Sequence, residues 1–180
     1  HMDYNKLSEL LFSHITKTPA DYEAIYPKRN LPEGAKVTRF APSPTGFLHI
    51  GGLFASLISE RIAHQSDGVF ILRIEDTDDK RAIDNGVELI LEDLEHYNYI
   101  VNEHPNKGGE YGPYIQTQRK EIYHTVAKYL VSIGRAYPCF CSKDKLDILR
   151  EQQNTDKVRT GYYGKYASCK NLSIDEAIAR

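Results

Sequence analysis

The sequence predicts an α/β fold in which helices cover a parallel sheet. Two short apolar segments, residues 37–40 and 69–74, have the composition of buried strands, and a helical pattern follows each of them. Strands and helices that alternate at this spacing are typical of parallel strand pairs. The connection after the first strand, residues 41–52, combines prolines with a glycine pair. Because ligands bind at the carboxyl ends of parallel strands, the same pattern predicts where the functional site lies.

The composition of the chain is that of a globular protein. It has 180 residues, of which 41% are hydrophobic and 27% charged, and its formal net charge is −2. No apolar run reaches the roughly 18 residues of a membrane span, so we expect no membrane partner. The low net charge gives no indication of nucleic-acid binding, although a local basic patch would suffice for it. Three cysteines, an odd number, argue against a disulfide framework and for a reducing, cytoplasmic location.

The other elements follow from apolar residues that recur at helical spacing. Residues 3–16 form the first expected helix, with an apolar face from Leu7 to Ile15. The further expected helices are residues 53–65, 83–97, 119–133 and 143–153, and a short strand is expected at residues 136–141. Connections are expected at residues 17–34, 102–113 and 154–169.

The two ends of the chain carry their own signals. The N-terminus has no signal-peptide pattern, and we interpret His1-Met2 as a cloning remnant. Near the other end, Ser173 and Glu176 form the pattern of a capping box. This pattern predicts that a helix begins only a few residues before Arg180. We therefore expect the chain to be a piece of a longer protein.

The loop after the first strand has the features of an anion- and nucleotide-binding turn. Free N–H groups at the start of the next helix favour an anion, and His49 can donate hydrogen bonds to phosphate oxygens. Gly51 and Gly52 would let a flat ligand press against the backbone, while Pro42 and Pro44 stiffen the loop. The loop is neither the dinucleotide fingerprint nor the lysine-containing phosphate loop. On its own, the pattern also fits a tight turn with a surface histidine.

This loop is part of a longer motif. Residues 39–46 read Arg-Phe-Ala-Pro-Ser-Pro-Thr-Gly, and residues 49–52 read His-Ile-Gly-Gly. Together they resemble the first signature of class I aminoacyl-tRNA synthetases, in the form seen in glutamyl-tRNA synthetases. The resemblance covers residues 36–172 and includes four further segments: residues 71–78, 112–114, 116–119 and 136–141.

The resemblance implies a fold and a division into domains. We expect a Rossmann-like parallel sheet, which is the first half of a class I synthetase catalytic domain, followed by the start of an inserted connective subdomain. The expected parts are an N-terminal helical extension at residues 1–35, the half domain at residues 36–135, and the acceptor-binding insertion at residues 136–180. The family's second signature, Lys-Met-Ser-Lys-Ser, does not occur, and the single methionine is Met2. Because that loop brings cations to the triphosphate, we expect this chain to be inactive alone.

The resemblance also implies roles for individual residues. Arg39 and Ser43 stand where the family contacts the substrate glutamate, and Glu75 stands where it contacts the amino group. A forked, permanently charged guanidinium suits a carboxylate, although Arg39 and Glu75 would also fit a simple ion pair. Four positions belong to the ATP site, with histidine on the phosphates and glycines under the adenine: Thr45, His49, Gly51 and Gly52. The last three also form the catalytic signature.

Two aspartates after the second strand have another expected role. Asp76 and Asp78 could bind a metal ion, but carboxylates at this place more often cap helices, and we favour a capping and scaffold role. Magnesium would arrive with ATP and would need no dedicated protein site.

The three cysteines are candidate zinc ligands. Cys139 and Cys141 alternate along the expected strand, so both thiols would face the same way, and Cys169 follows later. The resemblance implies a structural zinc with a tyrosine as fourth ligand, for which Tyr163 is our choice and Tyr166 the alternative. Reduced cysteines that pack as small hydrophobic side chains remain the other explanation.

The leading functional hypothesis is the attachment of glutamate to tRNA(Glu) by a monomeric parent enzyme. Glutamate attacks the α-phosphate of ATP to give glutamyl-adenylate, and the terminal ribose of the tRNA then takes the glutamyl group. Glutaminyl-tRNA synthetases differ at residues 73–77 and at Gly52. A relative that glutamylates queuosine in tRNA is an alternative, and so is a non-catalytic, zinc-stabilised module that docks tRNA or a partner.

Overall fold

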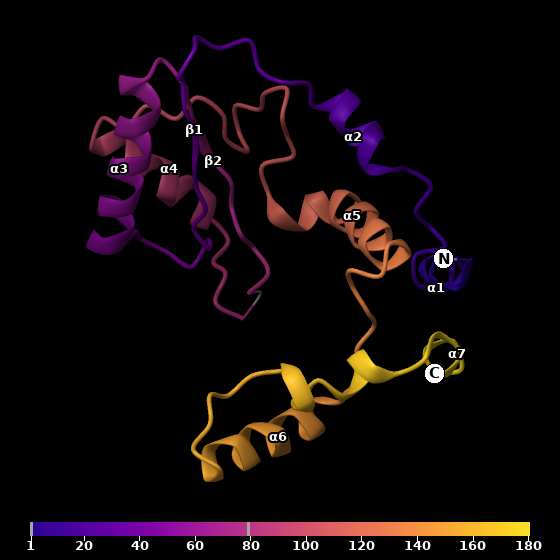
Figure 1. Cartoon of the computed structure of the whole chain (residues 1–180). Helices are drawn as coiled ribbons and strands as arrows, with labels where there is room; N and C mark the ends of the chain where they lie inside the picture. The colour runs from indigo at the N-terminus through magenta and orange to yellow at the C-terminus, as the bar shows by residue number, and fades with distance from the viewer. Residues whose placement is uncertain (1, 79) are drawn as a thin grey trace. The chain divides into compact units, whose positions relative to one another are not determined.

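The computed structural model describes residues 2–78 and 80–180, and these form two compact units (Figure 1). One unit contains residues 20–123 and the other combines residues 2–19 with residues 124–180. Helix α5 (Lys120–Ser132) begins in the first unit and continues in the second. Among the described residues, no helix is both long enough and apolar enough to cross a membrane. The expected division at residues 35 and 135 stays a prediction.

The first unit is built on the expected parallel strand pair. Strand β1 (Val37–Phe40) pairs with β2 (Val69–Leu72), with Val37 opposite Val69 and Phe40 opposite Leu72. The ladder continues past both strands, because Arg73 N–H donates to the Phe40 carbonyl at 3.0 Å. The regular part of the second strand nevertheless ends two residues earlier than expected, and Ile74 forms an isolated bridge with Ile115.

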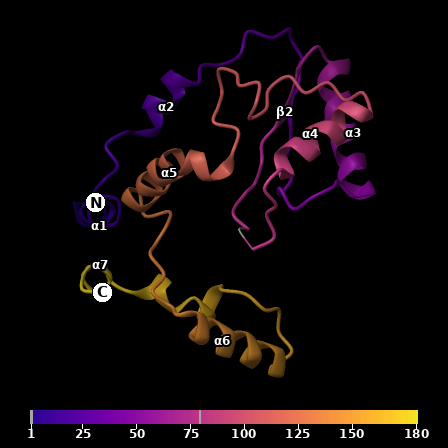
Figure 2. The ribbon, with the colours of Figure 1, turned by 180° about the vertical axis from the view of Figure 1, so that it is seen from behind.

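Two helices cover one face of this strand pair. Helix α3 (Ile50–Gln65) packs on both strands, and α4 (Gly86–His96) packs on β2; Figures 1 and 2 show both on the same side of the sheet. The core is made by four fully buried side chains: Leu72, Ile74, Ile90 and Leu94. Alternation along a strand sends the side chains of Arg39 and Arg73 to the opposite face. The sheet therefore separates an apolar core from a charged face.

The helix starts differ from the expected ones for local reasons. Helix α3 starts at Ile50, three residues earlier than expected, because the glycine pair takes helical geometry. Helix α4 starts at Gly86, three residues later than expected, because the Ile83 N–H bonds to the Pro44 carbonyl at 3.1 Å instead of starting a helix.

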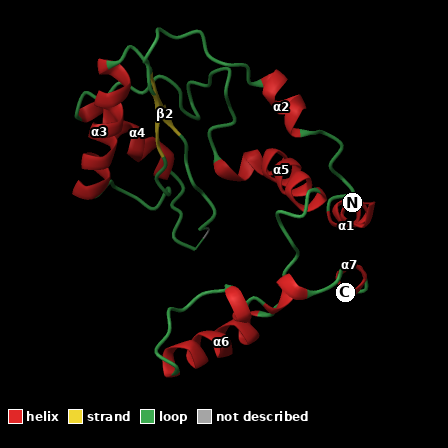
Figure 3. Ribbon diagram, viewed as in Figure 1, coloured by secondary structure: helices red, strands yellow, loops and turns green. Residues whose placement is uncertain are grey.

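Most of the remaining chain is helix and loop (Figure 3). Helix α1 (Met2–Leu11) is shorter than expected, and α2 (Pro19–Ile25) lies in a segment that we expected to be a connection. Proline is favoured at the first position of a helix, so Pro19 was a signal for the start of α2 that the sequence analysis did not use. The other elements are η1 (Gln116–Arg119), α6 (Lys143–Thr155), η2 (Gly164–Tyr166), η3 (Ser168–Asn171) and α7 (Ile174–Ile178).

The expected strand at residues 136–141 was wrong, while the capping box was confirmed. Residues 136–141 form no strand, because Pro138 has no N–H and no neighbouring strand offers a ladder among the described residues. At Ser173, both hydrogen bonds of the capping box with Glu176 are present. In the second unit, α1 packs on α7 around Leu7, Val131 and Ala177.

Candidate active site and thiol cluster

The candidate active site is built by the loop from β1 to α3. Pro44 is buried, and it lies so close to α4 that a Cβ at Gly86 would stand 2.5 Å from its carbonyl oxygen. The Leu48 N–H donates to the Asp93 carboxylate of α4 at 3.1 Å. The loop is therefore held in place by α4 at two points, and sequence reasoning had not assigned Asp93 this role.

The charged pair at the end of the strands has the expected geometry. Arg39 Nη1 lies 3.1 Å from Glu75 Oε1, with side-chain exposures of 40% and 37%. The Glu75 N–H donates to the Pro42 carbonyl at 2.8 Å, which fixes the backbone of both segments in register. Glu75 and Arg39 therefore lie on the same face of the sheet, as predicted. In this structure they pair with each other.

The polar residues of the loop are exposed around this pair. Ser43 and Thr45 are exposed, and the Thr45 N–H bonds to the Ser43 carbonyl at 2.9 Å. His49 is the N-cap residue of α3 and is also exposed, but its side chain makes no capping hydrogen bond. The imidazole thus has no part in holding the helix start, and the first N–H groups of α3 have no intrahelical acceptor.

The two glycines at the start of α3 are not required by the packing of the chain itself. A Cβ at Gly51 would meet nothing within 4 Å, and one at Gly52 would make ordinary contacts at 3.7 Å. Glycine inside a helix costs about 0.5–1 kcal/mol relative to alanine. The structure therefore offers no internal reason for this unfavourable pair.

Asp76 has the scaffold role that we expected. Its carboxylate accepts hydrogen bonds from the Thr117 N–H at 3.0 Å and from the Thr117 hydroxyl at 2.6 Å, at the start of η1. Asp78 accepts from Arg81 Nε at 2.6 Å, within its own turn. Both carboxylates are used by the fold.

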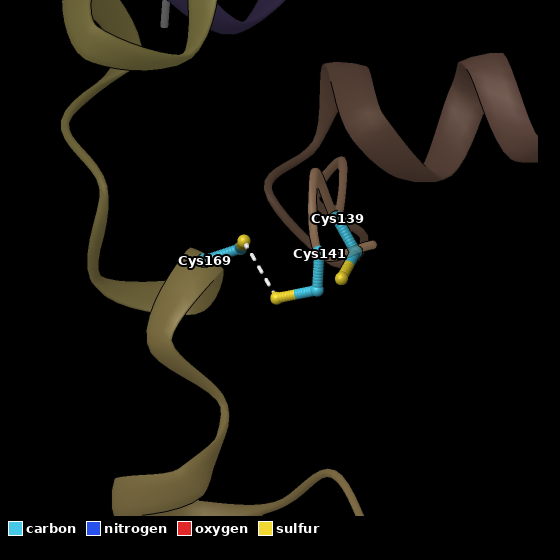
Figure 4. Close-up of side chains that lie close together, drawn as sticks. All are labelled: Cys139, Cys141 and Cys169. Atoms are coloured by element: carbon cyan, nitrogen blue, oxygen red, sulfur yellow. Dashed lines mark hydrogen bonds between the residues drawn. The ribbon is translucent and has the colours of Figure 1, made fainter. Parts of the chain in front are cut away.

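The three cysteines converge in the second unit (Figure 4). Their sulfur atoms all lie within 4.8 Å of one another, and Cys141 Sγ is 3.7 Å from Cys169 Sγ. Cys139 and Cys141 come from the segment before α6, and Cys169 comes from η3. The predicted convergence is confirmed, although the strand on which it was based does not form.

The tyrosine beside the thiols is Tyr162, which corrects our choice of Tyr163. The Tyr162 hydroxyl lies 3.5 Å from Cys141 Sγ and accepts the Cys169 N–H at 3.0 Å. The Tyr163 hydroxyl instead donates to the Arg159 carbonyl at 2.5 Å, and its ring packs edge-on against Tyr166. Successive side chains of an extended segment point in opposite directions. A shift of one residue therefore decides which tyrosine hydroxyl lies beside the thiols.

The thiols have an environment that favours a thiolate. The hydrogen bond with Tyr162, and then that from the Phe140 N–H, lower the pKa of the Cys169 thiol to about 6. The thiols of Cys141 and Cys169 raise the pKa of the Tyr162 hydroxyl. In tetrahedral zinc sites the Zn–S bond is about 2.3 Å, which places sulfurs roughly 3.8 Å apart. The Cys141–Cys169 separation fits such a site.

These features define a class of protein, and comparison with known proteins names it. The chain is an α/β protein in which a strand-to-helix loop carries an exposed histidine beside an arginine–glutamate pair. The profile of one family, described as tRNA synthetases class I (E and Q), catalytic domain, matches residues 36–178. The chain belongs to this family of class I aminoacyl-tRNA synthetases.

Similar proteins include glutamate–tRNA ligases. The chain is 56% identical, over 97% of its length, to the glutamate–tRNA ligase of Acetivibrio thermocellus, and 49% identical, over 99%, to that of Clostridium beijerinckii. It spans 33% of each of these relatives, about a third of their length. The crystal structure of a glutamate tRNA ligase from Elizabethkingia meningosepticum in complex with its amino acid matches at 37% identity, with a TM-score of 0.66, over 76% of this chain and 27% of that one.

Proposed function

We propose that the chain is the first part of an enzyme that activates glutamate with ATP and attaches it to tRNA(Glu). The observation that carries the proposal is the Arg39–Glu75 pair beside the exposed loop of His49. The glutamate tRNA ligase of known structure binds its amino acid, and the similarity supports the same substrate here. A cytoplasmic location and a monomeric parent enzyme are part of this proposal.

The geometry supports different roles in substrate binding for Arg39 and Glu75. Glutamate carries two carboxylates and one ammonium group, so its binding would replace the 3.1 Å ion pair with two substrate contacts. Arg39 would take a carboxylate through its forked N–H groups, with the Ser43 hydroxyl beside it. Glu75 would take the ammonium group. A half-exposed pair is a suitable site for this exchange, because such pairs contribute little to stability.

ATP would lie on the start of α3. The open surface at Gly51 leaves room for the adenine to press on the backbone beside Gly52, and Thr45 belongs to the same loop. The His49 imidazole is free to donate to the phosphates, together with the first N–H groups of the helix. Magnesium would come with the triphosphate. The reaction needs no protein nucleophile, so these residues act by positioning and by charge.

The thiol cluster supports a structural zinc site. Cys139, Cys141 and Cys169 would supply three thiolates, and the Tyr162 oxygen would complete four ligands. The ion would tie η3 to the segment before α6 and stabilise this part of the chain.

The experiment is an exchange of homologous parts. The chain replaces the corresponding third of the Acetivibrio thermocellus glutamate–tRNA ligase, and glutamate-dependent exchange of pyrophosphate into ATP is measured with tRNA present. We expect exchange by the chimera, and at least about a hundredfold less when Arg39→Gln is introduced. A folded chimera, judged by its melting curve, that performs no exchange would contradict the proposal.

A further inference from the structure

Four arginines meet on the charged face of the sheet, around a cavity of about 300 Å³ in the first unit. They are Arg29, Arg39, Arg73 and Arg119, and three tyrosines, Val37 and Ile71 complete the lining. The cavity lies on the side of the sheet away from α3 and α4. Part of its wall comes from residues that precede the family match, which begins at residue 36.

Two of these arginines have carboxylate partners. Arg29 forms an ion pair with Glu103 and lies 3.8 Å from the centroid of the Tyr111 ring. Arg39 forms the pair with Glu75. Each of these two charges is therefore compensated within the unit.

The other two arginines have no carboxylate of their own among the described residues. Arg73 Nη2 approaches Glu75 only to 4.0 Å, and that carboxylate is already bound to Arg39. Arg119 donates from Nη1 to the neutral Pro113 carbonyl at 2.8 Å. The Nε atoms of both Arg73 and Arg119 are buried and have no hydrogen-bond partner in the described part of the chain.

This crowding has an electrostatic effect on Arg73. Burial, and then the neighbouring positive charge of Arg39, lower the pKa of its guanidinium, with a further contribution from Arg119. A buried N–H without an acceptor and a charge without a counter-charge are both costly. Such groups are rare in folded proteins, and a bound water molecule or ion is one of the ways in which they are completed.

The remaining polar groups of the lining restrict what the ligand can be. The Tyr111 hydroxyl donates to the Pro27 carbonyl at 2.6 Å, and the Tyr114 hydroxyl donates to Glu103 at 3.0 Å. The Tyr26 hydroxyl donates to the Gly112 carbonyl at 2.5 Å. The unused donors are therefore guanidinium N–H groups, which prefer the oxygens of carboxylate and phosphate.

We infer that Arg73 and Arg119 form a binding site for a small oxyanion, a carboxylate or a phosphate group, in this cavity. The site borders the proposed glutamate site, because Arg39 also lines the cavity, but it does not rest on the proposed function, because neither Arg73 nor Arg119 was assigned to glutamate or ATP. The anion supplies a counter-charge for both guanidiniums and acceptors for those of their N–H groups that border the cavity.

The test follows the arginine Nε–H signals of the ¹⁵N-labelled chain by NMR, with neither glutamate nor ATP present. Inorganic phosphate is titrated in one series and acetate in another, at constant ionic strength. We expect the Arg73 and Arg119 signals to move saturably with at least one probe, with half-saturation on the order of 1 mM. The probe that binds shows whether the site prefers a phosphate group or a carboxylate.

Variants make the test specific. Arg73→Gln and Arg119→Gln should each weaken binding about tenfold, whereas Arg81→Gln, an exposed arginine paired with Asp78, should leave it unchanged. Signals that move linearly, or that survive Arg73→Gln at full affinity, would overturn the proposal.

The melting temperature provides a second measurement that separates binding from a structural role. Phosphate or acetate, whichever binds, should raise the melting temperature of the wild type, and Arg73→Lys should keep part of the gain. In buffer without either anion, Arg73→Gln should be at least as stable as the wild type, because it removes an uncompensated charge. A large loss of stability there would mean that Arg73 is only structural, and would also overturn the proposal.

Discussion

Arg39 and Glu75 stand at the ends of two neighbouring parallel strands, and a single 3.1 Å contact joins their side chains on the charged face of the sheet. The pair is more than a third exposed on both sides, so water weakens it. Its contribution to the stability of the fold is small, and we propose that its main role is to bind a zwitterionic substrate with two carboxylates.

The first prediction concerns this contact. Glu75→Gln should leave the melting temperature of the chain within about 4 °C of the wild type, because an exposed ion pair contributes at most about 1 kcal/mol. The same change should weaken glutamate binding at least about tenfold, because the ammonium group loses its counter-charge. Glu88→Gln, on the exposed surface of α4, is the matched control and should change neither quantity.

The second prediction distinguishes Gly51, which we propose contacts a ligand, from Gly86, which the packing of the chain requires. Gly51→Ala should stabilise the chain by about 0.5 kcal/mol, because a Cβ there meets nothing and alanine favours the helix. It should nevertheless weaken ATP binding, because the methyl group occupies the surface proposed for the adenine. Binding is measured by calorimetry and stability by urea unfolding.

Gly86→Ala is the contrasting variant. Its Cβ would stand 2.5 Å from the Pro44 carbonyl oxygen, so we expect a loss of about 1–3 kcal/mol in the free energy of unfolding. If Gly51→Ala destabilised the chain as much as Gly86→Ala, the distinction between a ligand-facing and a packing glycine would be wrong.

The third prediction is a pH dependence of stability. His64 Nδ1 lies 2.6 Å from Glu60 Oε1, and Nε2 lies 2.8 Å from Asn102 Oδ1, which also accepts the Phe70 N–H. Burial alone would lower the pKa of His64, but the hydrogen bonds to Asn102 and Glu60 outweigh it and raise the pKa above 6.5. A raised pKa contributes stability that is complete below pH 6.5 and is lost as the pH rises through the folded-state pKa.

The measurement is the free energy of unfolding from pH 5.5 to 8.5 for the wild type and His64→Gln. The wild-type advantage should shrink as the pH rises. His104 provides a control of opposite sign, because burial and then Lys107 lower its pKa, so its contribution improves with rising pH. A wild-type advantage over His64→Gln that is constant across this range would refute the assignment.

The fourth prediction concerns zinc. Protein prepared without chelators should hold about one zinc per chain, and Cys169→Ser should lose it. Tyr162→Phe should lower zinc affinity about tenfold or more, whereas Tyr163→Phe, whose hydroxyl is bound to the Arg159 carbonyl, should not. Equal effects of the two tyrosine variants would contradict the placement of Tyr162.

Sequence reasoning reached the strand pair, the helices and the Arg39–Glu75 contact because hydrophobic periodicity and strand polarity determine them locally. It missed α2 because a seven-residue helix with no buried residue leaves little apolar pattern. It chose the wrong tyrosine because the segment before Cys169 is irregular, so spacing did not tell which ring would turn toward the thiols. Tyr162 precedes Cys169 by seven residues, and only the folded structure shows that this spacing brings its hydroxyl to the thiols.

The arginine cavity could not be predicted for a different reason. Its lining comes from the segment before β1, from both strands and the residue after β2, from the loop before η1 and from the end of η1, and no local pattern links these parts. Arg29 meets Glu103 across 74 residues of sequence, and such contacts depend on the complete fold.

The most direct test of the central claim is an NMR titration of the ¹⁵N-labelled chain with glutamate and with ATP. Weak binding suffices for this measurement, since signals shift in fast exchange at millimolar affinity. The account predicts that glutamate shifts the signals of Arg39, Ser43 and Glu75, that ATP shifts those of His49, Gly51 and Gly52, and that Arg39→Gln abolishes only the glutamate response. Glutamate shifts that persist undiminished in Arg39→Gln, or ATP shifts confined to residues outside the loop of His49, would contradict it.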